Sequence, residues 1–436
     1  MRFERRLGQF GTVAQTYLRP PRCACQNSPM LERRKGAAHS YLILTQYFPP
    51  EVGAPQIRLL AVARELLAAG NRVTVVTAMP NYPLGRVFDG YSRRVLLKET
   101  VAGVPVIRTW VRATTASSVP GRLGSYLSFA ATSLVGCFRA GRHDVVLVES
   151  PPLFLGATAY LFSRLTRARM VLSVSDLWPA SAKELGIVTN PLLLAAAERL
   201  ESFLYRKAYR VAALTEGIYN AVDGRGSVVL FPNGVDARMF TKLAAGPGGK
   251  RATFVYTGTH GYAQGLEVIV EAADLLRDRA DVEFVLIGDG PDKARVQALA
   301  AERGLDNLRF EPSVPVDEMP RILSDARASI VPLRNTPLFR GARPSKIMPA
   351  LACETPVIFC GEGEAAAILE SNACGLVVPP EDPAALAAAV RRLADDPAEA
   401  AALGRHGREL VLREFDWSSI VTRGLAEMGL SAGSDA

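Results

Sequence analysis

A basic loop that runs into an apolar helix contains the residue types in this sequence with the clearest chemical use. Arg343, Ser345 and Lys346 precede a short Ala-rich helical pattern, and an apolar strand, Val357–Cys360, follows it. The free N–H groups and the positive dipole end at a helix start attract phosphate, and the two cations add positive charge beside them. A solvated basic loop before a helix would show the same residues. The position of this loop late in a long α/β pattern favours a diphosphate site.

A glycine-rich loop, Gly258–Gly265, joins a strand to a helix in the same half of the chain. Its three glycines allow a ligand to approach the backbone closely, and the helix start that follows can hold a phosphate. His260 adds a side chain that can donate to a diphosphate or a sugar hydroxyl, and we expect a histidine in such a loop to lie outside the core. A plain β–α turn would also explain the glycines, so both interpretations stay open.

Two further loops follow predicted strands. Gly288, Asp289 and Gly290 form a tight turn, which turn chemistry alone can explain. Asp176 follows a buried strand and lies close in sequence to Trp178, whose ring can stack on a sugar. A carboxylate in that position suits acceptor binding or base chemistry, and an Asp that caps the next helix is the alternative.

The composition excludes several classes of protein. The chain has 436 residues and a formal net charge of +8, of which residues 1–36 supply +6 through eight Arg or Lys against two Glu. The rest is close to neutral, without the basic face and interleaved aromatics of a nucleic-acid-binding protein. Six scattered cysteines and four histidines give no CxxC pair and no zinc spacing, which indicates reduced thiols and no metal. Residues 1–37 lack a signal-peptide core and are expected to be a disordered basic extension, with Met30 as an alternative start.

From residue 40 the chain repeats a strand–loop–helix pattern, and the pattern restarts after a linker-like stretch, Ala244–Lys250. Such units give doubly wound parallel sheets with ligands at the carboxyl ends of the strands. We therefore predict two Rossmann-like α/β domains that flank a cleft, residues 38–228 and 229–412. A C-terminal helix and tail, residues 413–436, would cross back to the first domain. The run Val211–Leu214 is expected to close the first sheet.

One stretch, Leu123–Phe138, is apolar enough to consider as a membrane segment. It is shorter than the roughly 20 residues that a span requires, and Arg122 and Arg139 flank it. A buried helix is favoured over an interfacial one.

Taken together, these loops resemble those of the retaining GT-B glycosyltransferases of family 4 (group 1). The resemblance is greatest to the bacterial branch that makes O-antigen and exopolysaccharide and includes fucosaminyl-type transferases. It covers roughly residues 40–425 and depends on eight short segments in order. These segments are Gln46–Pro55, Ser150–Phe154, Asp176–Pro179, Asn233–Asp236, Gly258–Gly265, Gly288–Pro291, Pro344–Lys346 and Gly375–Pro383.

The resemblance implies transfer of a sugar from a nucleotide diphosphate-sugar, held by the C-terminal domain, to a lipid-linked or other saccharide acceptor on the N-terminal domain. No metal or other cofactor is implied, because helix dipoles and basic side chains neutralise the leaving diphosphate. The enzyme would be cytoplasmic or peripheral on the inner face of the plasma membrane, in polysaccharide or glycolipid synthesis. The implied catalytic residues are Lys346, His260 and Asp176. The implied donor-binding residues are Gly258, Thr259, Gly261, Gln264, Gly288, Asp289, Gly290, Arg340, Arg343, Ser345 and Glu364. The implied acceptor-side residues are Gly53, Ala54 and Trp178.

The sequence departs from the family at two places. The family often has an Arg/Lys pair in the glycine-rich loop, where this chain has His260 and Gln264, so Lys346 with Arg340 or Arg343 must supply the charge. The family also has two glutamates eight positions apart, the second of which holds the ribose; here those positions are Gly341 and Pro349. Proline cannot bind a ribose, although it is tolerated if a helix begins there. Glu362 or Glu364 is the substitute that we expect.

The missing glutamates keep two other functions open. One is a non-catalytic subunit that binds sugar nucleotides. The other is a GT-B-fold sugar-nucleotide epimerase, although those sites use catalytic carboxylates and histidines, and this chain has only four histidines.

The basic extension generates a first prediction. Removal of residues 1–37 should leave folding and activity intact, because Arg-rich, Pro-broken sequence has little apolar surface to bury. Solubility, circular dichroism and turnover of the shortened protein check this. An insoluble or inactive shortened protein would contradict it.

Overall fold

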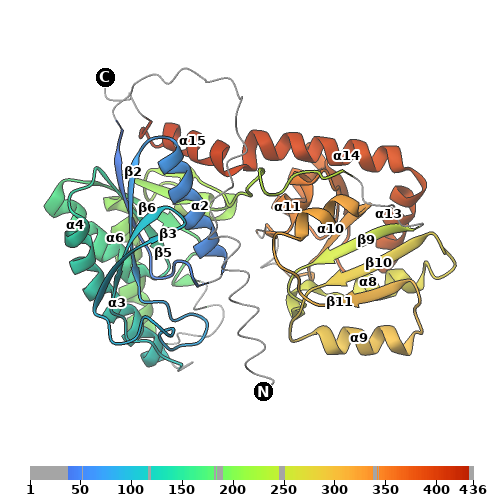
Figure 1. Ribbon diagram of the computed structural model, residues 1–436, viewed down its shortest axis with the longest axis horizontal. Helices are drawn as coiled ribbons and strands as arrows, with labels where there is room; N and C mark the ends of the chain where they lie inside the picture. Colours follow the sequence, from blue (N-terminus) through green and yellow to red (C-terminus); the bar gives the residue numbers. More distant parts are fainter. Residues whose placement is uncertain are drawn as a thin grey trace. The chain divides into compact units, whose positions relative to one another are not determined.

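The computed structural model describes residues 38–51, 53–115, 119–180, 183, 190–244, 251–336, 341 and 343–431. The chain forms two compact units, one that ends at Pro232 and also includes the segment from Ile420, and one that spans Asn233–Ser419 (Figure 1). The expected extension 1–37, most of the linker and Arg340 lie outside the described residues.

The first unit contains an eight-stranded sheet in the order β3-β4-β2-β1-β5-β6-β7-β8. All neighbours are parallel except β3 and β4, which form an antiparallel hairpin at one edge. The strands are β1 (Ser40–Leu44), β2 (Arg72–Ala78), β3 (Leu96–Val101), β4 (Val104–Thr109), β5 (Val145–Ser150), β6 (Arg169–Val174), β7 (Arg210–Ala213) and β8 (Val228–Leu230). The helices are α2 (Ala54–Ala68), α3 (Val119–Ala140), α4 (Leu153–Thr166), α6 (Pro191–Lys207) and α7 (Glu216–Val222).

The expectation that Val211–Leu214 closes this sheet is wrong, because β8 pairs with β7 beyond it. The strand β8 has only three residues, and just one of them is buried, so it carries no clear apolar pattern. At the other edge, the solvent-facing residues of β3 make its sequence too polar to stand out as a strand.

Two layers of helices cover this sheet. Apolar residues of α3, α4, α6 and α7 pack with the strands into one core. Residues of α2 face the C-terminal segment, with Val62 and Leu66 lining an apolar pocket together with Val421 and Leu425. The hydroxyl of Tyr41 on β1 donates to the carbonyl of Leu430 at 3.3 Å. The predicted return of the C-terminal helix to the first domain is therefore confirmed.

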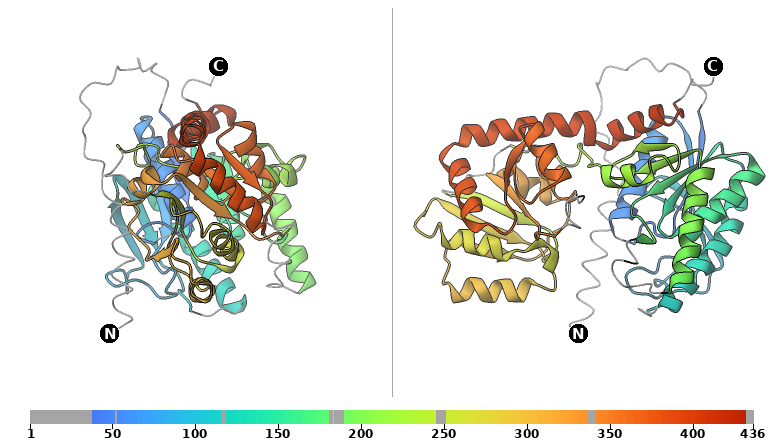
Figure 2. Two further views of the ribbon diagram at one scale, coloured as in Figure 1. Left: turned by 90° about the vertical axis from the view of Figure 1, so that its right-hand side faces the viewer. Right: turned by 180° about the vertical axis from the view of Figure 1, so that it is seen from behind.

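The second unit contains a six-stranded parallel sheet in the order β11-β10-β9-β12-β13-β14, and both units match the predicted doubly wound α/β architecture (Figure 2). Its strands are β9 (Ala252–Thr257), β10 (Val282–Ile287), β11 (Leu308–Glu311), β12 (Ala328–Pro332), β13 (Val357–Cys360) and β14 (Gly375–Val378). Its helices are η1 (Tyr262–Gln264), α8 (Glu267–Asp274), α9 (Lys293–Glu302), α10 (Met319–Asp325), α11 (Ile347–Ala352), α12 (Glu364–Ser371), α13 (Pro383–Asp395), α14 (Pro397–Leu410), η3 (Val411–Phe415) and the first residues of α15 (Trp417–Glu427).

The helix that we expected to begin at Pro349 begins two residues earlier, at Ile347, with Lys346 as its N-cap. Pro349 is therefore the third helical residue. The N–H groups of a first helical turn have no partner within the helix, so the N–H that proline lacks would not have been used there. The substitution of the family's glutamate by proline thus leaves this helix intact.

The apolar stretch Leu123–Phe138 lies within α3, whose one side is buried and whose other side is exposed. No helix among the described ranges is both long and apolar enough to cross a membrane.

A buried ion pair joins α2 to the sheet of the first unit. Arg58 on α2 pairs with Glu149 at the end of β5, and each side chain is only 3% exposed. Arg58 Nη1 also donates to Ser173 Oγ on β6 at 2.9 Å. A charge in such a position is tolerated only with its partner, because burial removes its hydration.

This pair generates a prediction about stability. Glu149→Gln should lower the free energy of unfolding by about 3–5 kcal/mol, since it leaves the Arg58 charge buried and uncompensated. Arg392→Gln is the matched control, because its partner Glu399 and Arg392 itself are 24% and 60% exposed and such pairs contribute at most about 1 kcal/mol. Urea unfolding of both variants measures the difference. Equal effects would show that water reaches the Arg58–Glu149 pair.

Candidate functional site

The candidate site in the second unit lies where its strand order reverses. The central strand β9 has β10 on one side and β12 on the other, so the loops after β9 and β12 diverge at the carboxyl edge. Ligands of doubly wound sheets bind at such a point. The loop after β9 is the glycine-rich loop that the sequence analysis selected.

The glycine-rich loop packs directly on the backbone of the turn after β10. A Cβ on Gly288 would lie 1.9 Å from the carbonyl oxygen of Gly258, and one on Gly290 would lie 2.3 Å from that of His260. Both glycines also have positive φ angles, 145° and 159°, which other residues rarely adopt. The N–H of His260 donates to the carbonyl of Asp289 at 2.9 Å, and that of Asp292 donates to His260 at 3.0 Å. Only glycine fits at these positions of the turn.

Lys346 extends from the N-terminus of α11 to the glycine-rich loop. Its Nζ donates to the Tyr256 hydroxyl at 2.7 Å and lies 3.9 Å from the centre of the Tyr256 ring. A Cβ on Gly258 would be 3.4 Å from the same Nζ, whereas Gly258 and Thr259 themselves are exposed. The structure therefore brings Lys346 and Gly258 together at a surface that a ligand can reach.

Burial sets the charge of the two titratable groups next to this loop. It lowers the pKa of Lys346 to about 7, so the amine is partly neutral at physiological pH. Burial, and then the charges of Lys293 and Lys346, lower the pKa of His260 to about 4. The imidazole is therefore neutral above about pH 5.

The expectation that His260 lies outside the core is wrong, because its side chain is fully buried. Its ring makes edge contacts with Tyr256 and Phe310, at 5.5 and 6.3 Å between ring centres. Neither ring nitrogen has a hydrogen-bond partner among the described residues. The loop turns this side chain inward, beneath the backbone that faces solvent.

The other predicted donor-side residues differ in their accessibility. Arg343 lies 3.7 Å from Glu364 on α12, and its guanidinium lies 5.2 Å from the centre of the Phe415 ring. Ser345 and Asp289 are exposed. Gln264 folds back toward Gly261, where an added Cβ would be 2.8 Å from its Oε1.

Arg334, in the loop after β12, is a residue that the sequence analysis missed. Its Nη1 donates to Glu381 at 3.0 Å, its Nη2 pairs with Glu267, and its Nε donates to the carbonyl of Tyr262 at 2.8 Å. It thus ties the loop after β12 to η1, α8 and the loop after β14. These partners lie 47 to 72 positions away in the chain, so no local pattern could have indicated them.

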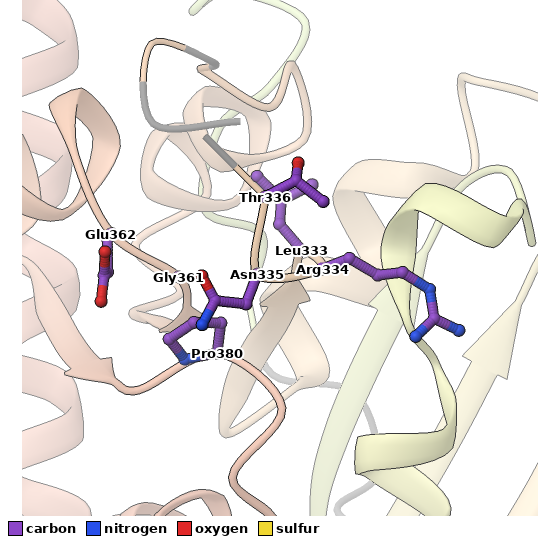
Figure 3. Close-up of a pocket in the computed structure, with 7 residues that line it drawn as sticks. All are labelled: Leu333, Arg334, Asn335, Thr336, Gly361, Glu362 and Pro380. Carbon is purple, nitrogen blue, oxygen red and sulfur yellow. The ribbon is translucent and has the colours of Figure 1, made fainter. Parts of the chain in front are cut away.

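A small, open pocket adjoins Arg334 (Figure 3). The Arg334 side chain points away from the other lining residues. The pocket itself lies between the loops after β12, β13 and β14. Glu362, which the sequence analysis offered as a substitute for the missing glutamate, lines this space. The full set of lining residues is Leu333, Arg334, Asn335, Thr336, Gly361, Glu362 and Pro380.

The acceptor-side predictions fall in the first unit, at the carboxyl edge of its sheet. Gly53 is the N-cap of α2 after β1, and Ala54 is the first, exposed residue of that helix. Asp176, in the loop after β6, is exposed. Trp178 packs partly against the core. Only a portion of the indole is therefore available to stack on a ligand.

Glu51, which the sequence analysis did not select, holds the loop before Gly53. It is buried and accepts hydrogen bonds from the N–H groups of Phe48, Asn81 and Tyr82, at 3.1, 2.7 and 2.8 Å. Burial raises its pKa to about 7 despite these donors. A carboxylate two residues before a helix N-cap resembles an ordinary capping residue, so the sequence gives little signal of this role.

Both halves of the chain match glycosyltransferase families. Residues 53–234 match the family described as "Glycosyl transferase 4-like domain", and residues 242–410 match "Glycosyl transferases group 1".

The chain is also similar to individual proteins in sequence and to solved structures in fold. The chain is 28% identical, over 354 residues, to a protein of Escherichia coli (strain K12) assigned as the colanic acid biosynthesis glycosyl transferase WcaI. The aligned region is 75% of this chain and 85% of that protein. The fold is similar to that of sucrose-phosphate synthase from Thermosynechococcus elongatus, with a TM-score of 0.67, 20% identity and coverage of 88% and 97% of the two chains. It is also similar to HepE of Anabaena in complex with UDP and glucose, with a TM-score of 0.63, 14% identity and coverage of 89% and 98%.

The lowered pKa of Lys346 generates a prediction about binding. A bound nucleoside diphosphate would raise that pKa, so binding would take up a proton above pH 7 and the affinity would fall by up to about tenfold per pH unit between pH 7 and 9. Isothermal titration with UDP and GDP in buffers of different ionisation enthalpy measures both effects. Lys346→Arg is the control, because arginine stays charged and should bind without proton uptake. The same pH slope in that variant would place the titrating group elsewhere.

Proposed function

Because the chain is a retaining GT-B glycosyltransferase of family 4 (group 1), we propose that it moves a sugar from a nucleotide diphosphate-sugar to a saccharide acceptor on a lipid carrier. The product would be cell-surface polysaccharide or glycolipid. The similarity to a glycosyl transferase assigned to colanic acid biosynthesis supports this class of product. Within the family we favour the branch for O-antigen and exopolysaccharide, which includes fucosaminyl-type transferases.

The observation that carries the proposal is the Lys346 ammonium beside the exposed backbone of Gly258. When the bond between the sugar and the diphosphate breaks, negative charge grows on the leaving phosphate oxygen. Lys346 is placed to neutralise that charge, since a phosphate on the Gly258–Thr259 backbone would meet its Nζ. A cation in a partly desolvated site acts more strongly than the same cation in water. In this proposal Lys346 supplies the positive charge that the Arg/Lys pair provides in other members of the family.

In this proposal His260 does not donate directly to the phosphate. A neutral, buried ring supports the loop from below and adds no charge to it. The ligand would contact the backbone of Gly258 and Thr259, with Gly261 and Gln264 at the two ends of η1.

The ribose would be held by a carboxylate other than the one that Pro349 replaces. Glu364 is the first residue of α12, and its pairing with Arg343 fixes its direction. Glu362 lines the small pocket and is the second candidate. We favour Glu364, since Arg343 beside it could also contact the diphosphate.

The acceptor would bind to the first unit, and the donor to the second. Gly53 and Ala54 follow β1 and Asp176 follows β6, so all three lie at the ligand-binding edge of the first sheet. Asp176 is exposed and could accept a hydrogen bond from an acceptor hydroxyl. A lipid carrier implies action at the cytoplasmic face of the plasma membrane.

The test is to incubate the full chain with UDP-, GDP- and dTDP-sugars and a lipid extract of bacterial membranes. We expect one donor to release its nucleoside diphosphate, and Lys346→Ala to lower turnover about a hundredfold or more while the donor affinity changes less. Melting temperatures of both proteins control for misfolding. A new sugar nucleotide without release would indicate an epimerase. Full turnover of the alanine variant would exclude Lys346 from the reaction.

A further inference from the structure

The helices α3 and α4 of the first unit expose apolar side chains that no described element covers. Leu127, Val135 and Phe138 on α3 are 47%, 54% and 51% exposed, and Leu161 and Leu165 on α4 are 46% and 61% exposed. Their spacing of three, four or eight positions places them on one side of each helix. Single exposed apolar residues are common on proteins, but a contiguous set of this kind marks an interaction surface.

The two apolar stripes are neighbours in space. Thr158 Oγ of α4 donates to the carbonyl of Ala130 on α3 at 2.8 Å. Near the other end, the rings of Phe138 and Phe162 meet edge to face with their centres 5.4 Å apart. The two helices therefore lie side by side on one face of the sheet (Figure 1), and together they form a single surface, here called the α3–α4 face.

The charged residues on α3 and α4 have one sign. Neither helix contains an Asp or Glu. Four exposed arginines, Arg139, Arg142, Arg164 and Arg167, lie at or just after the C-terminal ends of the two helices, and none has an ion-pair partner among the described residues. The two acidic residues between the helices are engaged elsewhere, since Asp144 accepts from Ser40 at 2.7 Å and Glu149 pairs with Arg58.

We propose that the α3–α4 face binds the surface of an anionic lipid bilayer. The apolar stripes would enter the boundary between headgroups and acyl chains, and the arginines would contact the lipid phosphates. Neither helix can cross the membrane, so the contact is peripheral. The proposal deepens the proposed function and rests on it for its purpose, because a lipid-linked acceptor is itself held in a bilayer.

A bilayer fits the α3–α4 face better than a protein partner does. Protein interfaces combine an apolar centre with a mixed polar rim, whereas α3 and α4 carry exposed arginines, including Arg122 in the first turn of α3, and no acidic residue. An anionic membrane presents many phosphates and no fixed pattern of partners, which suits unpaired arginines beside apolar side chains.

The test is the partition of the full chain into vesicles, measured by co-sedimentation. We expect binding to vesicles of phosphatidylcholine with phosphatidylglycerol, weak binding to phosphatidylcholine alone, and loss of the difference when salt rises from about 0.1 M to about 1 M. Val135→Gln/Phe138→Gln/Leu165→Gln should lower the partition about tenfold or more. Arg142→Gln/Arg167→Gln should abolish the preference for the anionic lipid.

Matched controls are Leu275→Gln/Leu412→Gln and Arg391→Gln/Arg405→Gln, which change exposed residues of the same kinds on the second unit and should bind as wild type. The altered apolar side chains of the α3–α4 face are 51% to 61% exposed, so the folds should be kept, and melting temperatures without ligand verify this on the same preparations. Wild-type binding by the Val135/Phe138/Leu165 variant, or no binding by the wild type, would overturn the proposal. Because the vesicle assay requires neither donor nor acceptor, a failed transfer reaction leaves its outcome unaffected.

Discussion

The candidate donor site depends on one backbone contact, between the loop after β9 and the turn after β10. Since the Gly258 carbonyl occupies the place where any side chain at position 288 would begin, the two loops can approach only through glycine. Hydrogen bonds between the two backbones then fix the loop in place. This contact turns His260 inward and leaves Gly258 and Thr259 at the surface. The geometry of the site thus comes from the absence of side chains as much as from their presence.

The same contact explains how a single lysine can serve the site. Lys346 reaches the exposed loop from a helix whose own sequence is almost entirely apolar, and Tyr256 beneath it supplies both a hydroxyl and a ring face. Burial lowers the pKa of Lys346 to about 7, so the neutral and charged forms of the amine are both populated near pH 7. The site is therefore poised between two charge states, so that an incoming anion determines which one prevails. An arginine, which stays charged, would lack this property.

Much of the architecture was predictable because buried parallel strands appear in a sequence as short apolar runs, as in Tyr41–Leu44 and Phe284–Ile287. The two edge strands were not predicted. The strand β3 has solvent-facing polar residues, and β8, with three residues, is too short to show a pattern. In the candidate site, Gly258 and Lys346 could be selected from residue type together with their position in the α/β pattern. The inward turn of His260 and the partners of Arg334 could not, because both follow from contacts between segments distant in the chain.

The C-terminal segment from Ile420 completes a structure that begins almost four hundred residues earlier. Apolar side chains of α2, β1, β5 and β6 face a pocket whose other wall consists of Val421, Leu425, Met428 and Leu430. A ribosome releases these residues only after the whole second unit has been made. The first unit must therefore wait with part of one face of its sheet uncovered while the second unit folds. Premature termination would damage the first unit, although the missing residues lie at the opposite end of the gene.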